Sequence, residues 1–170
     1  GVTKTHFSLA EIKIQKTKNI LEGSLQIAKT IKDDYQNYRS FVIFSTYEDM
    51  EYLSTGLSLL CKNLRKFVVF TGGYDLICRP NSDSASNLST SLAIAQTYKI
   101  PEVTIFHHNS LFRANRVIRT KCEGNELFKS LNYPPLATAT NQDITVNWEN
   151  ILNRNSSISD RVQLEIEEVG

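Results

Sequence analysis

Three short, continuously apolar runs separated by helical patterns constrain the fold of this chain more than any other feature. The runs are residues 41–44, 67–70 and 103–106, and none shows the polar alternation of a half-exposed strand. Continuous apolar strands are typical of a parallel sheet with both faces covered, because helical crossovers lie over those faces. The sequence therefore predicts three neighbouring parallel strands at these positions.

Apolar residues spaced three and four apart predict the helices that connect these runs. The spacing holds from Met50 to Leu64, and again from Ala85 to Ala95, which predicts a helix over about 84–98. An earlier helix is expected to end near Tyr38. The alternation of helix and strand indicates an α/β fold with a doubly wound, mostly parallel sheet and right-handed crossovers.

The pattern weakens after residue 110, where short strands are expected at 136–139 and 144–148. The polar stretch 153–159 reads as a linker, so the predicted organisation is an α/β domain over 1–152 and a linker and tail over 153–170. The alternating segment 162–166 is interpreted either as a strand for a partner's sheet edge or as a floppy tail.

Charge and cysteine usage exclude several classes of function. Nineteen Lys and Arg against 18 Asp and Glu leave a net charge of +1, so neither a nucleic acid partner nor an anionic membrane is expected. No apolar run approaches the length that membrane insertion needs. Cys61, Cys78 and Cys122 have neither disulfide nor zinc spacing. We expect free thiols in an intracellular protein of the cytoplasm, or of an organelle or ciliary assembly, without a metal or cofactor.

A ligand site in such a sheet is expected outside the carboxyl ends of its strands. Glu48 follows the first strand, where it either caps the next helix or holds an ammonium group. Gly72 and Gly73 follow the second strand, and either a turn with positive φ or close approach to a ligand accounts for them. His107 and His108 follow the third strand and are interpreted as polar loop residues rather than metal ligands.

Several motifs together resemble the bacterial-type L-asparaginase family, in particular its cytosolic type. The most specific stretches are LFRANRVIRT at 111–120 and FKSLNYPPLA at 128–137. Thr71-Gly72-Gly73 and Ser82-Asp83, followed by Asn87-Leu88, match a preceding block in order and spacing. The resemblance implies a truncated fold like the asparaginase N-terminal domain.

The same resemblance implies hydrolysis of a side-chain amide through an acyl-enzyme that uses two threonines, an aspartate and a lysine. One threonine of the family falls on Tyr47, the aspartate on Glu48 and the lysine on Arg119. The other threonine lies in a turn that nothing before Ile14 matches. Because arginine cannot act as a base, we expect a catalytically inactive protein, not an enzyme, that serves as a structural or interaction subunit.

Two alternatives remain open. One is an asparaginase-type amidohydrolase completed by another segment, and the other is an amino-acid-binding domain that uses Glu48, Gly72, Gly73 and Asp83. Protein partners in a multi-subunit assembly, or a homo-oligomer, are expected because a lost first strand leaves an open sheet edge. Alternatively, residues 1–13, in which Phe7, Leu9 and Ile12 alternate, replace that strand internally.

Overall fold

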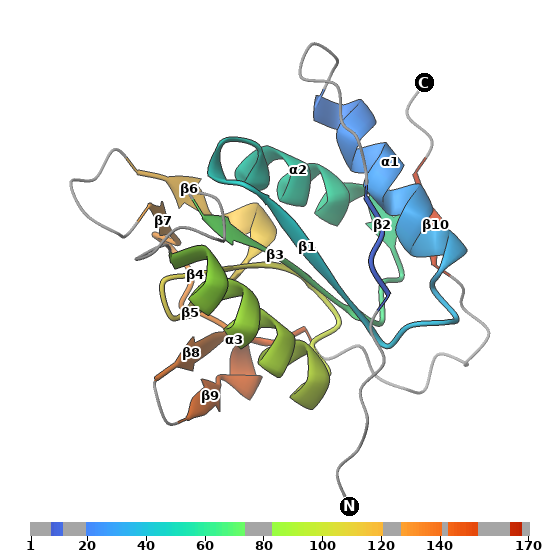
Figure 1. Cartoon of the computed structure of the whole chain (residues 1–170). Coiled ribbons are helices and arrows are strands. Elements are labelled where there is room, and N and C mark those ends of the chain that lie inside the picture. The colour runs from blue at the N-terminus through green and yellow to red at the C-terminus, as the bar shows by residue number, and fades with distance from the viewer. Residues whose placement is uncertain are drawn as a thin grey trace, which may run out of the picture.

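The computed structural model describes residues 8–11, 20–73, 83–120, 127–140, 143–152 and 164–167 (Figure 1). Its helices are α1 (Ile20–Asp33), α2 (Tyr47–Leu60) and α3 (Asp83–Thr97), with 3-10 turns η1 (Ala114–Arg116) and η2 (Trp148–Asn150). The central sheet contains β1 (Ser40–Thr46), β3 (Phe67–Gly73), β4 (Val103–His107), β5 (Ser110–Arg113), β8 (Ala137–Ala139) and β9 (Ile144–Val146). Two small antiparallel pairs join β2 (Cys61–Lys62) to β10 (Glu165–Ile166), and β6 (Ile118–Arg119) to β7 (Phe128–Lys129).

The central sheet runs in the order β1-β3-β4-β5-β8-β9. Strands β1, β3 and β4 are parallel neighbours, with Val42 opposite Val69 and Val69 opposite Thr104. The predicted set of three neighbouring parallel strands is therefore confirmed. From β4 onwards the pairs are antiparallel, and a two-residue turn joins β4 to β5.

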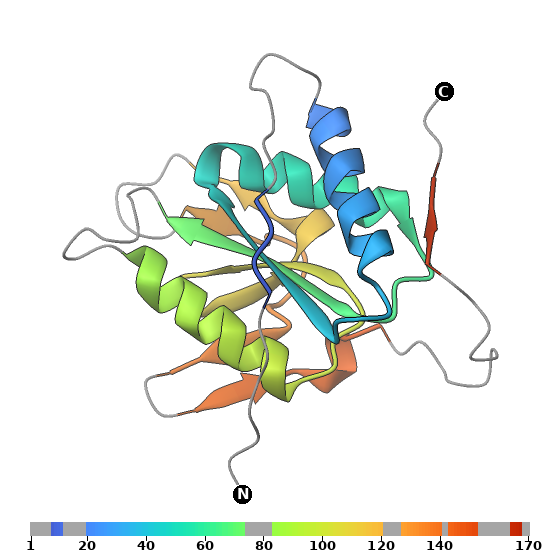
Figure 2. The ribbon, with the colours of Figure 1, turned by 45° about the vertical axis from the view of Figure 1, so that its right-hand side comes forward.

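The sheet separates two apolar cores. Val68 and Phe70 of β3 face α1 and α2, whereas Phe67 and Val69 face α3, because successive side chains of a strand point to opposite faces. Figure 2 shows α3 on one side of the sheet and α1 and α2 on the other. The continuous apolar run of β3 follows from this double cover, and all five residues of β4, including the polar Thr104 and His107, are buried.

The two helical crossovers differ in hand, which corrects the expectation that both are right-handed. The connections β1-α2-β3 and β3-α3-β4 step in the same direction across the sheet. Their helices nevertheless lie on opposite faces, so one of the two connections is left-handed. About 98% of such connections are right-handed. The apolar patterns of both helices are compatible with either face, so the hand could not be read from the sequence.

Strand β1 lies at an edge of the described sheet and is less buried than its apolar run predicts. Phe44 is 47% exposed, whereas Phe70 in the adjacent strand β3 is fully buried. The described residues add no strand beyond β1. Leu9 is 98% exposed and belongs to no strand, and Phe7 and Ile12 lie outside the described residues.

The segment at 164–167 packs against its own chain. Leu164 is buried in the core under α1 and α2, and Ile166 of β10 pairs with Cys61 of β2. These residues therefore behave neither as a strand for a partner's sheet nor as a floppy tail. Val162 and the linker at 153–163 lie outside the described residues, and the domain boundary after residue 152 stays a prediction.

Helix α1 ends at Asp33 rather than near Tyr38, and a turn follows it. The Lys66 ammonium donates hydrogen bonds to the carbonyls of Tyr35 and Tyr38, the latter at 2.6 Å. Asn37 N–H bonds to the Asp34 carbonyl at 3.0 Å. These bonds satisfy carbonyl groups of the turn, which therefore replaces another helical turn.

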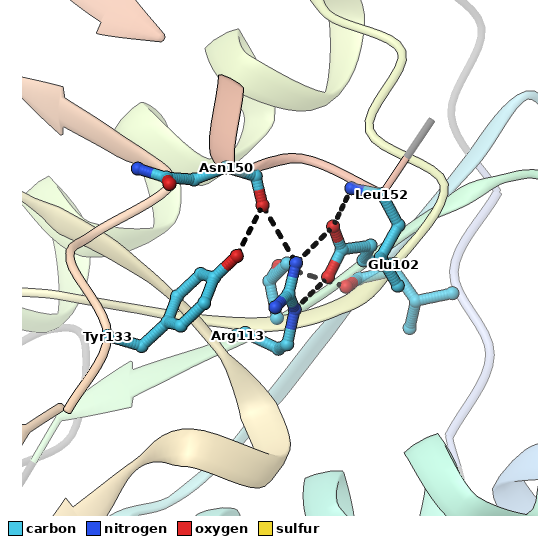
Figure 3. Close-up of polar contacts among 7 residues, drawn as sticks. Glu102, Arg113, Tyr133, Asn150 and Leu152 are labelled. Carbon is cyan, nitrogen blue, oxygen red and sulfur yellow. Dashed lines mark hydrogen bonds and ion pairs between the residues drawn. The ribbon is translucent and has the colours of Figure 1, made fainter. Parts of the chain in front are cut away.

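A buried ion pair fastens the segment around η2 to the sheet (Figure 3). Glu102 precedes β4, and its carboxylate pairs with the Arg113 guanidinium through two nitrogens. Arg113 also donates to the Asn150 carbonyl at 2.8 Å, and Leu152 N–H donates to Glu102 Oε1 at 2.7 Å. The Tyr133 ring lies under the guanidinium, 4.5 Å from centroid to Cζ. The hydrogen bonds and the charge of Glu102 raise the pKa of Arg113.

None of the helices in the described part of the chain is long and apolar enough to cross a membrane.

Candidate functional site

Four polar side chains meet beyond the carboxyl ends of the parallel strands. Tyr47 begins α2 directly after β1, and His107 is the last residue of β4. Asp83 begins α3, and Asn87 lies one turn further along that helix. Because α2 and α3 leave the same end of the sheet toward opposite faces, their first turns converge there, which is where α/β sheets bind ligands.

A hydrogen-bond network centres on the Tyr47 hydroxyl. The hydroxyl donates to Asp83 Oδ2 at 2.5 Å. Asn87 Nδ2 lies 3.1 Å from Tyr47 Oη and 3.0 Å from the Gly72 carbonyl oxygen, and donates to both. Tyr47 is 1% exposed, so the network holds its hydroxyl away from bulk water.

His107 completes the network, and its contacts fix its tautomer. Leu127 N–H donates to His107 Nε2 at 3.3 Å, so Nε2 is the acceptor of a neutral imidazole. The proton is therefore on Nδ1, which faces Tyr47 Oη at 3.1 Å. The rings of Tyr47 and His107 pack edge to face, with centroids 5.0 Å apart.

This arrangement is suited to activating a hydroxyl group. Asn87 and His107 both donate to Tyr47 Oη, and donors aimed at an oxygen stabilise negative charge on it. The Asp83 carboxylate accepts the hydrogen bond of the hydroxyl, and it stands at the N-terminus of α3, where negative charge is favoured. A nucleophile within hydrogen-bond reach of a base is the geometry of covalent catalysis.

Gly72 and Gly73 are explained by close approach and not by a positive-φ turn. Both lie in β3, and neither has φ in the left-handed region. A Cβ on Gly72 would lie 1.9 Å from the Ser45 carbonyl oxygen, and one on Gly73 would lie 1.7 Å from Ser84 Oγ. The glycines let β3 end tightly against β1 and α3. Residues 74 and 75, which follow them, lie outside the described residues.

The structure brings together only some of the residues singled out from sequence. Asp83 and Gly72 both contact the network, and Gly73 lies against Asp83. Glu48 is exposed on the first turn of α2, and Arg119 is exposed in β6. At that first turn the Thr46 hydroxyl bonds to Asp49 Oδ2 at 3.0 Å, and Glu48 makes no such bond to a described residue.

His107 and Asn87 have roles that the sequence pattern did not indicate. His107 is 1% exposed and belongs to β4, so it is no loop residue. Extending the predicted strand by one residue places it at the strand's carboxyl end. Asn87 stands out in the sequence only as part of a matching block. Among the described residues, no group of three or more His, Cys, Asp or Glu side chains is arranged to hold a metal ion.

A comparison with protein families shows to which family this chain belongs. The family model described as "Asparaginase, N-terminal" matches residues 10–152. The chain belongs to the asparaginase family. The asparaginase resemblance drawn from the motifs is thereby confirmed, as is the predicted α/β fold.

Individual asparaginases agree with this assignment. The L-asparaginase of Dirofilaria immitis is 37% identical over 75% of this chain and 21% of its own length. L-asparaginase 1 of Escherichia coli K12 is 39% identical over 66% of this chain and 33% of its own length. The crystal structure of L-asparaginase I from Vibrio cholerae superposes with a TM-score of 0.79 at 29% identity, covering 90% of this chain and 45% of that one.

The relatives differ in name and are all longer than the matching region. A Methanosphaera stadtmanae relative, 28% identical over 91% of this chain and 40% of its own length, is named as a subunit of a glutamyl-tRNA(Gln) amidotransferase. This asparaginase-family chain therefore spans between a fifth and two fifths of the curated relatives named here.

The expectation that the chain is not an enzyme is contradicted. Relatives that are 37% and 39% identical are named L-asparaginases, which points to an enzyme. The expectation rested on Tyr47, Glu48 and Arg119 as departures from the family's pattern. Position 47 nevertheless still carries a hydroxyl, and this hydroxyl meets a carboxylate from another helix.

Proposed function

We propose that this chain forms part of an asparaginase-type amidohydrolase in which Tyr47 is the nucleophile and Asp83 its proton acceptor. The hydrogen bond from Tyr47 to Asp83, at the carboxyl ends of the parallel strands, carries the proposal. The substrate class is an amino acid with a side-chain amide, as the names of the asparaginase relatives suggest.

The proposed reaction has two steps. The Tyr47 hydroxyl gives its proton to Asp83 while Oη attacks the amide carbon, and the C–N bond breaks as the leaving nitrogen takes that proton and departs as ammonia. An ester between Tyr47 and the substrate's acyl group remains. Water then attacks the ester and gives a proton to Asp83, which returns it to Oη. Asn87 and His107 stabilise the phenolate by their donated hydrogen bonds.

Substrate contacts are proposed on the side of this network where Asp83 meets solvent. Asp83 is half-buried and therefore reaches both Tyr47 and solvent. Gly72 and Gly73 bring the backbone of β3 close to the same point. Glu48, exposed on α2, remains a proposed contact for the substrate's ammonium group.

We propose further that the site is completed from outside the described residues. The family's threonine turn has no match before Ile14, and β1 leaves an edge without a partner strand among the described residues. A parallel strand added to β1 would end beside Tyr47. Such a strand would come from another segment, from a second copy, or from a partner in a multi-subunit assembly. The amidotransferase relative, itself named as a subunit, supports the last arrangement. An intracellular location stays a prediction.

Ammonia release tests the proposal. The protein is purified with the partners that accompany it, and release from L-asparagine and L-glutamine is compared for the native chain, Tyr47→Phe and Tyr52→Phe. Tyr52 is 56% exposed and serves as the control. We expect release that Tyr47→Phe abolishes and Tyr52→Phe preserves. Release that survives Tyr47→Phe would refute the nucleophile, and no release from any form would refute the activity.

A further inference from the structure

A positively charged pocket lies at the opposite end of the sheet from Tyr47. Its volume is about 520 Å³, and it is formed by the segments that lead into β1, β3 and β4. The pocket is lined by Gln36, Asn37, Tyr38, Arg39, Arg65, Lys66, Phe67, Tyr98 and Lys99. At about 3.3 Å per residue, the seven residues of β1 and of β3 hold this pocket roughly 20 Å from the Tyr47 network.

Among the described residues, the charged side chains that line this pocket are all basic. Four of the chain's 19 basic residues line the pocket and no acidic residue of the described ranges does, although the whole chain carries only +1. Asp33 and Asp34 are the acids on the neighbouring turn, and Asp34 Oδ1 accepts a hydrogen bond from Asn37 Nδ2 at 3.2 Å. Positive charge gathered in a concave site attracts anions more strongly than the same charge spread over the surface.

Two of the four cations are not needed for the fold. Lys66 binds the carbonyls of Tyr35 and Tyr38 and lies over the Tyr35 ring, so it has a structural role. Arg39 and Lys99 are exposed, and neither has an ion-pair partner among the described residues. They approach the pocket from the start of β1 and from the loop before β4.

We infer that this pocket binds a small polyphosphate anion. Guanidinium groups match phosphate oxygens in two-point hydrogen bonds, and ammonium groups add point charge. Arg39 and Arg65 supply the first kind of group and Lys99 the second, while Lys66, held by two backbone carbonyls, adds its charge to the pocket. The volume exceeds what one phosphate fills and lies in the range of small-molecule sites. Partial burial lowers the pKa of Lys66, and an adjacent anion would oppose that shift.

The experiment uses the intact protein with its accompanying partners. Binding of pyrophosphate, tripolyphosphate, ATP and adenosine is measured by calorimetry at low ionic strength. The native chain is compared with Arg39→Gln/Lys99→Gln and with Lys29→Gln/Arg116→Gln. The latter pair makes the same charge change at exposed residues outside the pocket. Melting temperatures without ligand confirm that both double variants fold.

We expect pyrophosphate or tripolyphosphate to bind with one site per chain. Arg39→Gln/Lys99→Gln should weaken binding at least tenfold, whereas the control pair should change it less than twofold. ATP binding equal to tripolyphosphate would assign recognition to the phosphates, and tighter ATP binding would add a nucleoside contact; both support the pocket. Binding of adenosine alone, equal weakening by both pairs, or no saturable binding of any polyphosphate would overturn the inference.

Discussion

Tyr47 donates a 2.5 Å hydrogen bond to Asp83, and each of these two residues is the first of its helix. Helices α2 and α3 begin at the same end of the sheet and run along opposite faces. The bond therefore joins the first turns of the two helices at the carboxyl ends of the parallel strands. Because the two crossovers differ in hand, α2 and α3 lie on opposite faces of the sheet and yet begin side by side at this end.

Removing the Tyr47 hydroxyl should destabilise the protein as well as inactivate it. Tyr47→Phe removes the short hydrogen bond to Asp83 Oδ2, which keeps only the 3.4 Å bond from Asn87 Nδ2, and it leaves His107 Nδ1 facing a ring. Unsatisfied buried polar groups cost about 1–3 kcal/mol. Urea unfolding should show a loss of that size, with Tyr52→Phe within about 0.5 kcal/mol of the native chain. A Tyr47→Phe protein as stable as the native chain would contradict the network.

The Glu102–Arg113 pair gives a prediction about buried charge. Arg113→Met leaves the Glu102 carboxylate, whose side chain is 3% exposed, without its counter-ion. Urea unfolding should show a loss of about 3–5 kcal/mol, because an uncompensated charge then stays buried.

A second variant distinguishes charge from packing at the same place. Glu102→Gln/Arg113→Met removes both charges, while the introduced amide carbonyl still accepts a hydrogen bond from Leu152 N–H. The double variant should recover at least half of the loss in urea unfolding. Equal losses in the single and double variants would show that lost packing, rather than uncompensated charge, causes the effect.

Gly72 cannot be replaced without separating β3 from β1. Gly72→Ala places a Cβ 1.9 Å from the Ser45 carbonyl oxygen, which is backbone and cannot rotate away. Overpacking costs about 1–3 kcal/mol, and we expect Gly72→Ala at the upper end of that range because backbone has to move. Gly56→Ala serves as the control, because its Cβ would meet the Oγ atom of Ser24, which belongs to a side chain and not to the backbone. Adding Ser24→Ala to Gly56→Ala should therefore restore much of the stability that Gly56→Ala alone loses. Thermal melting measures the stability of both variants. A Gly72→Ala protein that melts close to the native temperature would show that β1 and β3 lie further apart than described.

Aspartate substitutions test which strand lies at the edge. Val69→Asp buries an unpaired charge at a position with no exposure, and should prevent cooperative folding. Phe44→Asp, in β1, sits where the native ring is 47% exposed, and should leave a folded protein with a lower melting temperature. Calorimetry and circular dichroism distinguish these results. A cooperatively melting Val69→Asp protein would contradict the assignment of β3 to the centre.

Because the Cys61 thiol is buried, we expect the protein to lose stability at alkaline pH. Burial raises the pKa of its thiol to about 11, whereas an unfolded thiol ionises near a pKa of about 8.5. The folded-state pKa is the higher one, so the thiol's contribution is constant below about pH 8.5 and falls as the pH rises from there toward 11. Between about pH 8 and pH 10 the native chain should lose about 1–2 kcal/mol more than Cys61→Ala. Parallel losses in the two proteins would show that other groups govern alkaline unfolding.

The sequence predicts that the three strands are neighbours in one sheet, because their apolar runs indicate strands that are buried on both faces. It cannot place β1 at an edge, since Phe41 and Ile43 pack on a core whether or not a further strand covers the other side. It also cannot fix the crossover hand, because both helices carry an apolar stripe that suits either face.

The location of the site could be predicted from the sequence, but the full set of residues that form it could not. The ends of β1 and β3 and residue Asp83 follow from the strand pattern and the family motifs. The contacts of Tyr47 with His107 and Asn87 join residues 60 and 40 positions away. Pairings at such separations depend on strand register and helix placement, which no local pattern encodes. The sequence also singles out Glu48, which lies next to Tyr47; it is exposed on α2, and its contact with a substrate stays a proposal.

The opposite hands of the two crossovers lead us to expect an order of assembly in the folding chain. Before β4 docks, α3 can settle on either side of the β1–β3 pair, and the commoner winding would put both α2 and α3 on one side. With α1 and α2 already packed there, that side is occupied and α3 is directed to the other. We therefore expect the packed α1–α2 pair to act as a steric barrier on that face, so that substitutions which loosen this pair slow refolding.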